Sequence, residues 1–339
     1  MADDVAFNIA VYAKTDVGML RPGNEDGFLV LNLSTADTWT PDTVAGDPAD
    51  ALTCFPQSHY GSVLAVTDGM GGALAGEVAS RLAVECVRDR MLEIQASPTY
   101  SKLPFHERLR LSIELANAYI YQMGLKRSEC TGMGATFTAA GVSGSTAYFA
   151  QVGDSRAYVI RGGRVQQITK DQSLVGHLVE AGHITEEEAE RHTYKNVILQ
   201  ALGASPLVNV AVDRLALREM DVVVLCSDGL TNKMRAEEME EIIDGAGSLK
   251  EACESLVALA NSRGGEDNIT VLVAQFAGGK LREEADADSE RDTATLTAGL
   301  DRWGAEFVPR DPGLPAEIDP ALLDDEEDTL PPADTAENT

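Results

Sequence analysis

The chain has 339 residues, of which 44% are apolar and 24% charged, the usual mix of a folded protein with a sizeable core. Its formal net charge of −28 argues against a nucleic-acid partner, because phosphate backbones need clustered Lys and Arg. There is no run of about eighteen apolar residues, and the acidic start MADDVAFNIA lacks the basic residues of a secretory signal, so we expect no membrane partner and a cytoplasmic location.

The first part of the chain has three apolar runs typical of strands and two segments with the three- and four-residue spacing of amphipathic helices. The strands are expected at 7–15, 27–33 and 61–69, and the helices at 74–95 and 104–126. A polar stretch at about 34–60 has no convincing periodicity. We expect it to be a long surface loop inserted between two strands.

The second part begins with short β-rich runs over residues 132–168, separated by Gly-rich turns as in an antiparallel meander. An acid-rich helical passage, two strands, a helix and a final strand are then expected, at 171–192, 208–214, 221–226, 248–262 and 268–276. Beyond this the composition shifts, and residues 280–339 hold 18 acidic and 5 basic side chains, a local net charge of −13. The pattern predicts one folded domain at 1–277 and a disordered acidic tail at 278–339.

The cysteines argue against a disulfide framework and against a zinc knuckle. They are odd in number, far apart and without a CxxC pair: Cys54, Cys86, Cys130, Cys226 and Cys253. Cys226 lies inside the apolar run DVVVLCSDG, which favours a buried, inert thiol over a reactive one.

One pattern recurs along the chain: an apolar strand that ends, or begins, at an aspartate flanked by Gly, Ser or Asn. It occurs at Asp68, Asp154, Asp228 and Asp267, and the adjacent acids of RPGNEDGF add a fifth case. A single Asp-Gly is more often a plain turn. Several ionised carboxylates gathered at the ends of buried strands would repel one another, and a hard divalent cation removes that conflict. Ligation by oxygen alone suits Mg²⁺ or Mn²⁺, and the lack of clustered Cys and His argues against zinc.

The order of these motifs resembles that of a known family. The chain reads R-x-x-NED (21–26), V-x-DGMGG-x-x-x-G (66–76), TGMGATFT (131–138), VGDSRAY (152–158), ITKDQSLV (168–175), LCSDGL (225–230) and GGEDNITVLV (264–273). Over about residues 8–276 it is similar to the metal-dependent protein phosphatases, the type 2C or PPM family, in their bacterial form. The resemblance implies an α+β fold in which a central β-sandwich of two antiparallel sheets is flanked by α-helices, with the metal site at one end between the sheets.

The resemblance also assigns metal ligands position by position. Asp68 matches the carboxylate that bridges two ions, and the backbone carbonyl of Gly69 matches a ligand of one of them. Asp228 and Asp267 match the remaining ligands of the second ion. Asp154, together with Asp228, matches a third and weaker site of bacterial relatives. The expected cofactors are therefore two core Mn²⁺ or Mg²⁺ ions and a possible third.

The remaining assignments concern water and phosphate. Glu25 and Asp26 match the acids that hold the coordinated waters of the first ion, and Arg21 matches the arginine that grips the substrate phosphate. A hydroxide bridging the ions would attack phosphorus in line, so no phospho-enzyme is required. The implied activity is hydrolysis of phosphoserine and phosphothreonine on proteins, in signalling that opposes a Ser/Thr protein kinase. The expected partners are that kinase and its substrates, and the expected state is a monomer.

Other positions are expected to shape the site or to differ from relatives. Thr136, Ser155 and Asn268 are expected to support it without touching the reaction. Met70 stands where some relatives carry a histidine that could act as general acid, and HTYKN at 192–196 departs from the HPxRN of many relatives.

Two alternatives stay open at this point. A pseudophosphatase scaffold would bind phosphoproteins and dock through the acidic tail, although no core acid is missing. A hydrolase of small phosphate esters would differ only in its pocket surface. In the tail, LDRWGAEFVPR (300–310) reads equally as a docking motif or a weakly sticky patch, and DDEED (324–328) as a docking or a solubilising run.

Overall fold

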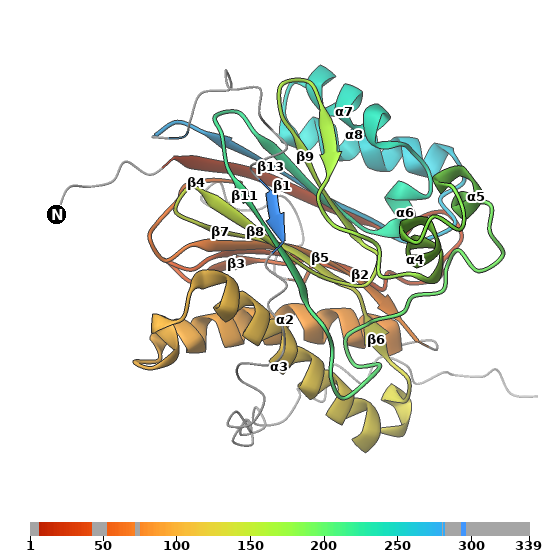
Figure 1. The fold of residues 1–339 in the computed structure, drawn as a ribbon, viewed down its shortest axis with the longest axis horizontal. Coiled ribbons are helices and arrows are strands. Elements are labelled where there is room, and N and C mark those ends of the chain that lie inside the picture. The colour runs from red at the N-terminus through yellow and green to blue at the C-terminus, as the bar shows by residue number, and fades with distance from the viewer. Residues whose placement is uncertain (1–6, 43–52, 72–74, 280, 282–292, 296–339) are drawn as a thin grey trace, which may run out of the picture. The chain divides into compact units, whose positions relative to one another are not determined.

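The computed structural model describes residues 7–42, 53–71, 75–279, 281 and 293–295. Residues 1–297 form one compact unit, in which two antiparallel sheets pack face to face with helices over their outer faces (Figure 1). The predicted α+β sandwich is therefore confirmed. No helix within the described ranges is both long and apolar enough to cross a membrane.

The first sheet has six strands and the second has eight. The order in the first is β10 (Val165–Gln167), β9 (Arg156–Ile160), β12 (Val222–Cys226), β13 (Ile269–Ala277), β1 (Asn8–Asp16) and β4 (Cys54–Pro56). The order in the second is β14 (Thr293–Thr295), β11 (Ala211–Ala216), β8 (Thr146–Val152), β7 (Phe137–Ser143), β5 (Ser62–Met70), β2 (Asp26–Asn32) and β3 (Asp37–Trp39), with β6 (Gly134–Ala135) paired to β5.

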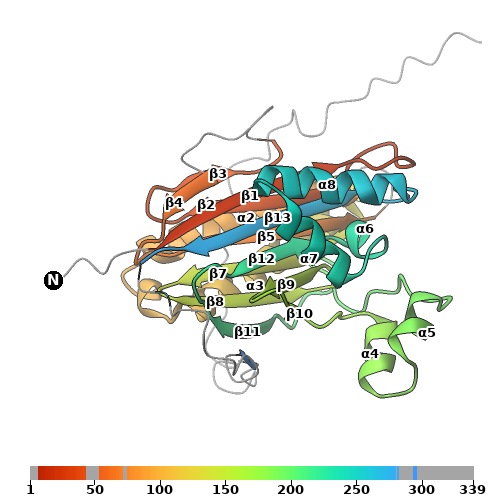
Figure 2. The same ribbon diagram turned by 90° about the horizontal axis from the view of Figure 1, so that it is seen from above.

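Two helix pairs cover the outer faces of the sheets (Figure 2). Helices α2 (Ala75–Ala96) and α3 (Phe105–Lys126) pack on the second sheet, and α7 (Ala236–Gly245) and α8 (Leu249–Ser262) on the first. Short helices α4 (Leu174–Glu180) and α5 (Glu186–Glu190) pack against each other, whereas α6 (Asp228–Thr231) packs against β13 and α8. Two 3₁₀ turns, η1 (Tyr100–Lys102) and η2 (Ser128–Cys130), flank α3.

Strand β13 shows why the layers form. Leu272 and Ala274 face the core between the sheets, whereas Val271 and Val273 face the core beneath α7 and α8. Because successive side chains of a strand point to opposite faces, an unbroken apolar strand needs cover on both sides. The run NITVLVAQF therefore requires a sheet on one face and helices on the other.

The segment at 34–60 differs from the expected surface loop. It contributes β3 and β4, which are edge strands of the two sheets. Trp39 and Phe55 are 4% and 3% exposed and belong to the core between the sheets. Three-residue strands are too short to show a periodicity in the sequence. Each of these two strands instead contributes one buried aromatic side chain to the core. Residues 43–52 lie outside the described residues.

Two further regions differ in detail. The passage predicted as helical at 171–192 is divided into α4 and α5 by a turn at Gly182, whose φ of +70° favours glycine. Beyond the predicted boundary at 277, Leu281 is buried in the core between the sheets and residues 293–295 pair with β11. Most of the predicted tail, including 300–310 and 324–328, lies outside the described residues.

Candidate active site

Strand pairing in the second sheet places two of the predicted acids side by side. Asp26 begins β2 and lies directly opposite Asp68 on β5. Both backbone polar groups of Asp68 form hydrogen bonds with Thr136. The Asp68 N–H donates to Thr136 Oγ1 at 2.9 Å, and the Asp68 carbonyl accepts from Thr136 N at 2.8 Å. The Thr136 hydroxyl also shares a 2.8 Å hydrogen bond with Ser155, so the support of Asp68 is buried and fully bonded.

The register of the first sheet brings three more acids to the same end. Cys226, the last residue of β12, pairs with Arg156 at the start of β9 and with Val271 near the start of β13. Asp154 precedes β9, Asp228 follows β12 and Asp267 precedes β13, so all three project from this end of the sheet. Burial and the charge of Asp26 raise the pKa of Asp68 most, and the charges of Asp228, Asp154 and Asp267 raise it further, as expected where both sheets contribute to one cluster.

The turn between β1 and β2 completes the group. Asn268 fastens this turn, because its side-chain oxygen accepts from Glu25 N at 2.8 Å and its amide nitrogen donates to two carbonyls of the turn at 2.9 Å each. Arg21 Nη2 donates to Asp267 Oδ2 at 2.8 Å, and the two side chains are 47% and 36% exposed. The structure thus brings all eight predicted site residues to one end of the sandwich, with Arg21 at the solvent-facing rim.

Two glycines allow the backbone to approach the acids closely. A Cβ on Gly69 would lie 2.1 Å from Gly76 O and 2.7 Å from Glu25 O, so no side chain fits there. A Cβ on Gly76 would lie 2.6 Å from the carboxyl carbon of Glu25. Glu25 therefore rests against the first turn of α2, where the partial positive charge of the helix N-terminus favours a carboxylate.

Burial makes the inner carboxylates hard to ionise. Desolvation raises the pKa of Asp26 to about 7, although Ser227 Oγ donates to its Oδ2 at 2.7 Å and acts in the opposite direction. Burial and then the charge of Asp26 hold the pKa of Asp68 well above its usual range. Burial raises the pKa of Glu25 as well.

The acids of the first sheet behave in the same way. Burial, followed by the charge of Asp228, raises the pKa of Asp154 to about 7. Burial and then the charge of Asp267 raise the pKa of Asp228, while a hydrogen bond from Asn232 lowers it. Such a group of mutually repelling carboxylates is stabilised by nearby positive charge.

The donor set fits a hard cation. Among the described residues, buried oxygens without a hydrogen-bond partner in the protein include Asp26 Oδ1, Asp154 Oδ1 and Asp228 Oδ1. Within the same ranges, no group of three or more His, Cys, Asp and Glu side chains is placed so that it could hold a metal ion as the side chains stand. Mg²⁺ and Mn²⁺ sites do not need one, because water and backbone carbonyls complete a shell begun by a few carboxylates. All available donors here are oxygens, as such ions prefer.

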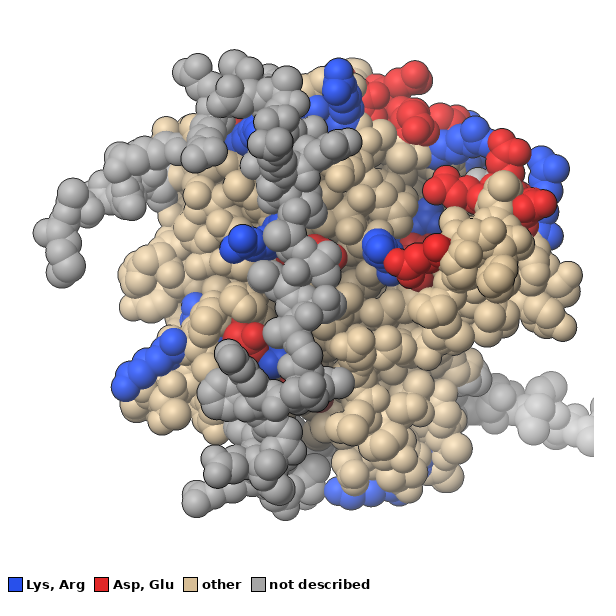
Figure 3. Space-filling model, in the orientation of Figure 1, with Lys and Arg blue, Asp and Glu red and all other residues tan. Residues whose placement is uncertain are grey.

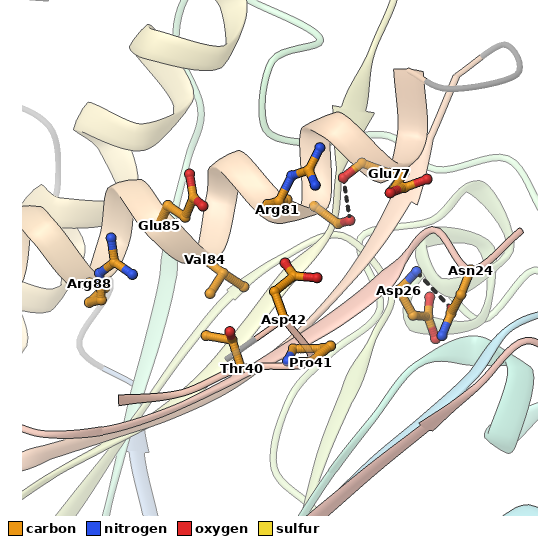
Figure 4. A pocket seen from close by; sticks show the side chains of 11 residues that line it. Asn24, Asp26, Thr40, Pro41, Asp42, Glu77, Arg81, Val84, Glu85 and Arg88 are labelled. Carbon is orange, nitrogen blue, oxygen red and sulfur yellow. Dashed lines mark hydrogen bonds between the residues drawn. The ribbon is translucent and has the colours of Figure 1, made fainter. Parts of the chain in front are cut away.

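A pocket of about 340 Å³ adjoins the cluster at Asp26. It runs along α2, with Asn24 and Asp26 at one end and Glu85 and Arg88 at the other (Figure 4). Its opposite wall is the segment 40–42 that follows β3. This pocket contains acidic and basic side chains together, so its charge does not select one kind of ligand.

Sequence reasoning missed a clamp that holds two of the acid-bearing segments together. Lys233, just after α6, donates to the carbonyl of Arg263 at 3.3 Å, and Arg263 Nη1 donates to the carbonyl of Lys233 at 2.7 Å. Lys233 also pairs with Glu266, the neighbour of Asp267. Around α7 and α8 acidic and basic side chains are intermixed on the surface (Figure 3). The clamp could not be distinguished in the sequence from such solvated charges.

Ser227 was also missed, although a signal for it exists. It is fully buried between the apolar run of β12 and Asp228, where a hydroxyl needs a partner. Its Oγ donates to Asp26 and accepts from Thr270 N at 3.0 Å, which links the two sheets next to the acids. A buried polar residue between a strand and a site acid is therefore informative.

Comparison with known proteins agrees with this geometry. A sequence model of the family described as Protein phosphatase 2C matches residues 46–270. The serine/threonine phosphatase stp of Listeria welshimeri is 39% identical over 221 residues, which cover 65% of this chain and 87% of that protein.

Solved structures give the same result. The S. agalactiae serine/threonine phosphatase superposes with a TM-score of 0.66 at 32% identity, covering 78% of this chain and 98% of that one. The catalytic domain of the phosphatase PstP, solved with 2 manganese ions, gives a TM-score of 0.62 at 29% identity, covering 80% and 100%. The chain belongs to the protein phosphatase 2C family and is a serine/threonine protein phosphatase.

Proposed function

We propose that the chain hydrolyses phosphoserine and phosphothreonine on proteins at this cluster of acids, with Mn²⁺ or Mg²⁺ as cofactor. The observation that carries the proposal is the set of buried carboxylate oxygens, on Asp26, Asp154 and Asp228, that have no partner in the protein. Leaving such groups unpaired costs stability, which a bound cation would recover. The manganese ions of the similar PstP domain support this choice of metal.

The assignment of ligands follows the resemblance to the protein phosphatase 2C family, position by position. Asp68 and the carbonyl of Gly69 would hold the core ions, Asp228 and Asp267 would complete the second, and Asp154 would serve a third with Asp228. Strand pairing fixes the backbones of Asp68 and Gly69, and the other three acids lie within two residues of paired strands, which limits their movement when an ion binds. Preorganised ligands of this kind raise affinity, because little conformational freedom is lost.

Glu25 and Asp26 would hold the waters of the first ion. Asp26 begins β2 and Glu25 directly precedes it, and the hydroxyl of Ser227 fixes one oxygen of Asp26 while leaving the other available. Bound ions would supply a coordinated water of lowered pKa, a source of hydroxide at neutral pH.

Arg21 would bind the substrate phosphate. Its guanidinium is half-exposed and is oriented by Asp267 through one nitrogen, so other N–H groups are available to phosphate oxygens. The positive charge of Arg21 would stabilise the negative charge on the phosphoryl oxygens and would so lower the energy of the transition state. Cys226 is buried, and burial raises its pKa to about 12, which argues against a thiolate nucleophile.

The metal site is tested by Asp228→Asn. The wild-type protein should hydrolyse a phosphothreonine peptide with Mn²⁺ and stop when EDTA is added. The variant should lose at least about a hundredfold in kcat/KM, since it removes a ligand of the activating ion. Asp244→Asn, at an exposed position on α7, is the matched control. Equal activity of Asp228→Asn and the control would refute the assignment.

We also propose a cellular role and a domain organisation for the chain. The chain would oppose a Ser/Thr protein kinase in cytoplasmic signalling, act as a monomer, and use residues 1–277 as the catalytic domain with 278–339 as an appended tail. The support is that the similar proteins are serine/threonine phosphatases. Phosphoproteomics of a deletion strain should show phosphoserine and phosphothreonine sites that accumulate. If no phosphoserine or phosphothreonine site accumulates in the deletion strain, the proposed role is contradicted.

A further inference from the structure

The turn that carries Arg21 also exposes apolar side chains. Met19 is 66% exposed, Leu20 is 70% exposed and Val17 is 38% exposed, within four positions of the chain. A single exposed apolar residue is ordinary, whereas adjacent ones beside a polar site are typical of a recognition surface. Here they immediately precede the residue proposed to bind phosphate.

Several contacts hold this turn in place. Met19 N donates to Gly265 O at 2.7 Å, and Gly18 N donates to Asp16 Oδ1 at 2.9 Å. The carboxyl of Asp16 is itself held by Asn261 of α8 at 3.0 Å. The exposed side chains therefore stand on a fixed backbone, which reduces the entropy lost when a partner binds.

Glycines bring the turn against the segment that carries Asp267. Gly18 has a φ of +78°, and a Cβ on it would lie 2.2 Å from Asp267 O. A Cβ on Gly265 would lie 2.9 Å from Met19 Cγ, so the Met19 side chain lies directly over the Gly265 backbone. Met19 is thus held beside the segment that carries Asp267, the partner of Arg21.

The spacing suits a peptide bound at Arg21. One residue of extended chain spans roughly 3.3–3.6 Å, so residues within two positions of a phosphorylated residue at Arg21 would lie within reach of the turn that carries Met19 and Leu20. The net charge of −28 disfavours an acidic segment as the partner and favours a neutral or basic one. An apolar side chain would bury the exposed surface of both residues.

We propose that Met19 and Leu20 form a specificity surface for an apolar residue within two positions of the phosphorylated Ser or Thr. The inference rests on the proposed function, because it requires phosphate to be bound at Arg21. The occupant is a segment of the phosphoprotein substrate.

The test compares two phosphothreonine peptides that differ only in having Leu or Ser at the neighbouring positions. The wild-type protein should prefer the Leu peptide by about tenfold in kcat/KM, mainly through KM, as expected for burial of about one aliphatic side chain. The double variant Met19→Ser/Leu20→Ser should reduce that ratio to about one. Because the readout is a ratio, a general loss of activity cancels. Leu207→Ser is the matched control, since Leu207 is 86% exposed and lies outside this turn.

The outcomes separate this inference from the proposed function. Equal hydrolysis of both peptides by the wild type, or a preference that survives in the double variant, would overturn the specificity surface and leave the phosphatase function standing. Failure of the wild type to hydrolyse either peptide with Mn²⁺ would overturn both. Loss of the preference in Leu207→Ser as well would also overturn it, because the effect would then not be specific to the turn.

Discussion

Replacing Asp154 with Asn should stabilise the metal-free protein, and the gain should depend on pH. Asp154 is only 8% exposed, and its Oδ1 has no hydrogen-bond partner in the protein. Burial and the charge of Asp228 raise its pKa from 3.8 to about 7. The folded state therefore holds the proton more tightly than the unfolded state does. The resulting stability is fully present below pH 3.8 and is lost as pH rises through about 7.

The magnitude follows from the size of this shift. The difference between the two pKa values corresponds to about 4 kcal/mol, at 1.36 kcal/mol for each pKa unit. Ionisation of Asp154 should cost about 4 kcal/mol at pH 8 and about 2 kcal/mol at pH 5. Asn has a similar shape and no charge. The stability gain of Asp154→Asn over the wild type should therefore be about 2–3 kcal/mol larger at pH 8 than at pH 5.

Urea unfolding in the presence of EDTA measures this difference. The wild type, Asp154→Asn and the control Asp37→Asn would be compared at several values between pH 5 and pH 8. Asp37 is exposed on β3, so its replacement should leave the pH dependence unchanged. A stability difference between Asp154→Asn and the wild type that is the same at pH 5 and pH 8 would refute the reasoning.

Three other predictions concern packing and reactivity. Gly69→Ala should abolish Mn²⁺ binding in calorimetry and lower the melting temperature, because its Cβ would lie 2.1 Å from Gly76 O; unchanged binding would contradict the geometry. Phe149→Ala should lower the free energy of unfolding by about 3–5 kcal/mol in urea titration, since the ring is fully buried between the sheets. Exposed Cys54 should react with a thiol reagent in the native state, whereas buried Cys226, with its pKa raised to about 12, should react only after unfolding, as mass spectrometry of the labelled peptides would show.

The sequence predicted most of the long elements, because their apolar patterns extend over many residues. Strand β13 was expected at 268–276 and spans Ile269–Ala277, and α8 was expected at 248–262 and spans Leu249–Ser262. Helix α7 was not predicted, since among its ten residues only Met239 and Ile243 are apolar and buried. The sandwich itself was expected from the family resemblance, because local periodicity does not say which strands pair.

The acids of the site could be predicted because each stands at the end of an apolar run, where a charge is conspicuous. The clamp of Lys233 and Arg263 could not, because its two members are distant in sequence and resemble ordinary surface charges. Each donates to the other's backbone carbonyl, and only the tertiary structure brings them together. Sequence thus identified the groups that carry the chemistry and missed those that hold them in position.

Strand register connects the residues that carry the chemistry with the residues that hold them in position. Asp26 lies opposite Asp68 only because β2 and β5 pair in one register, from Asn32 with Ser62 at the far end. A slip of one residue would turn Asp68 to the face of the sheet that α2 covers, and it would exchange the β5 side chains that face the other sheet with those that face α2. The core between the sheets, which includes Leu64 and Val66, therefore fixes the same register that the acids require. Burial of β5 positions Asp68, so stability and site geometry are determined by the same residues.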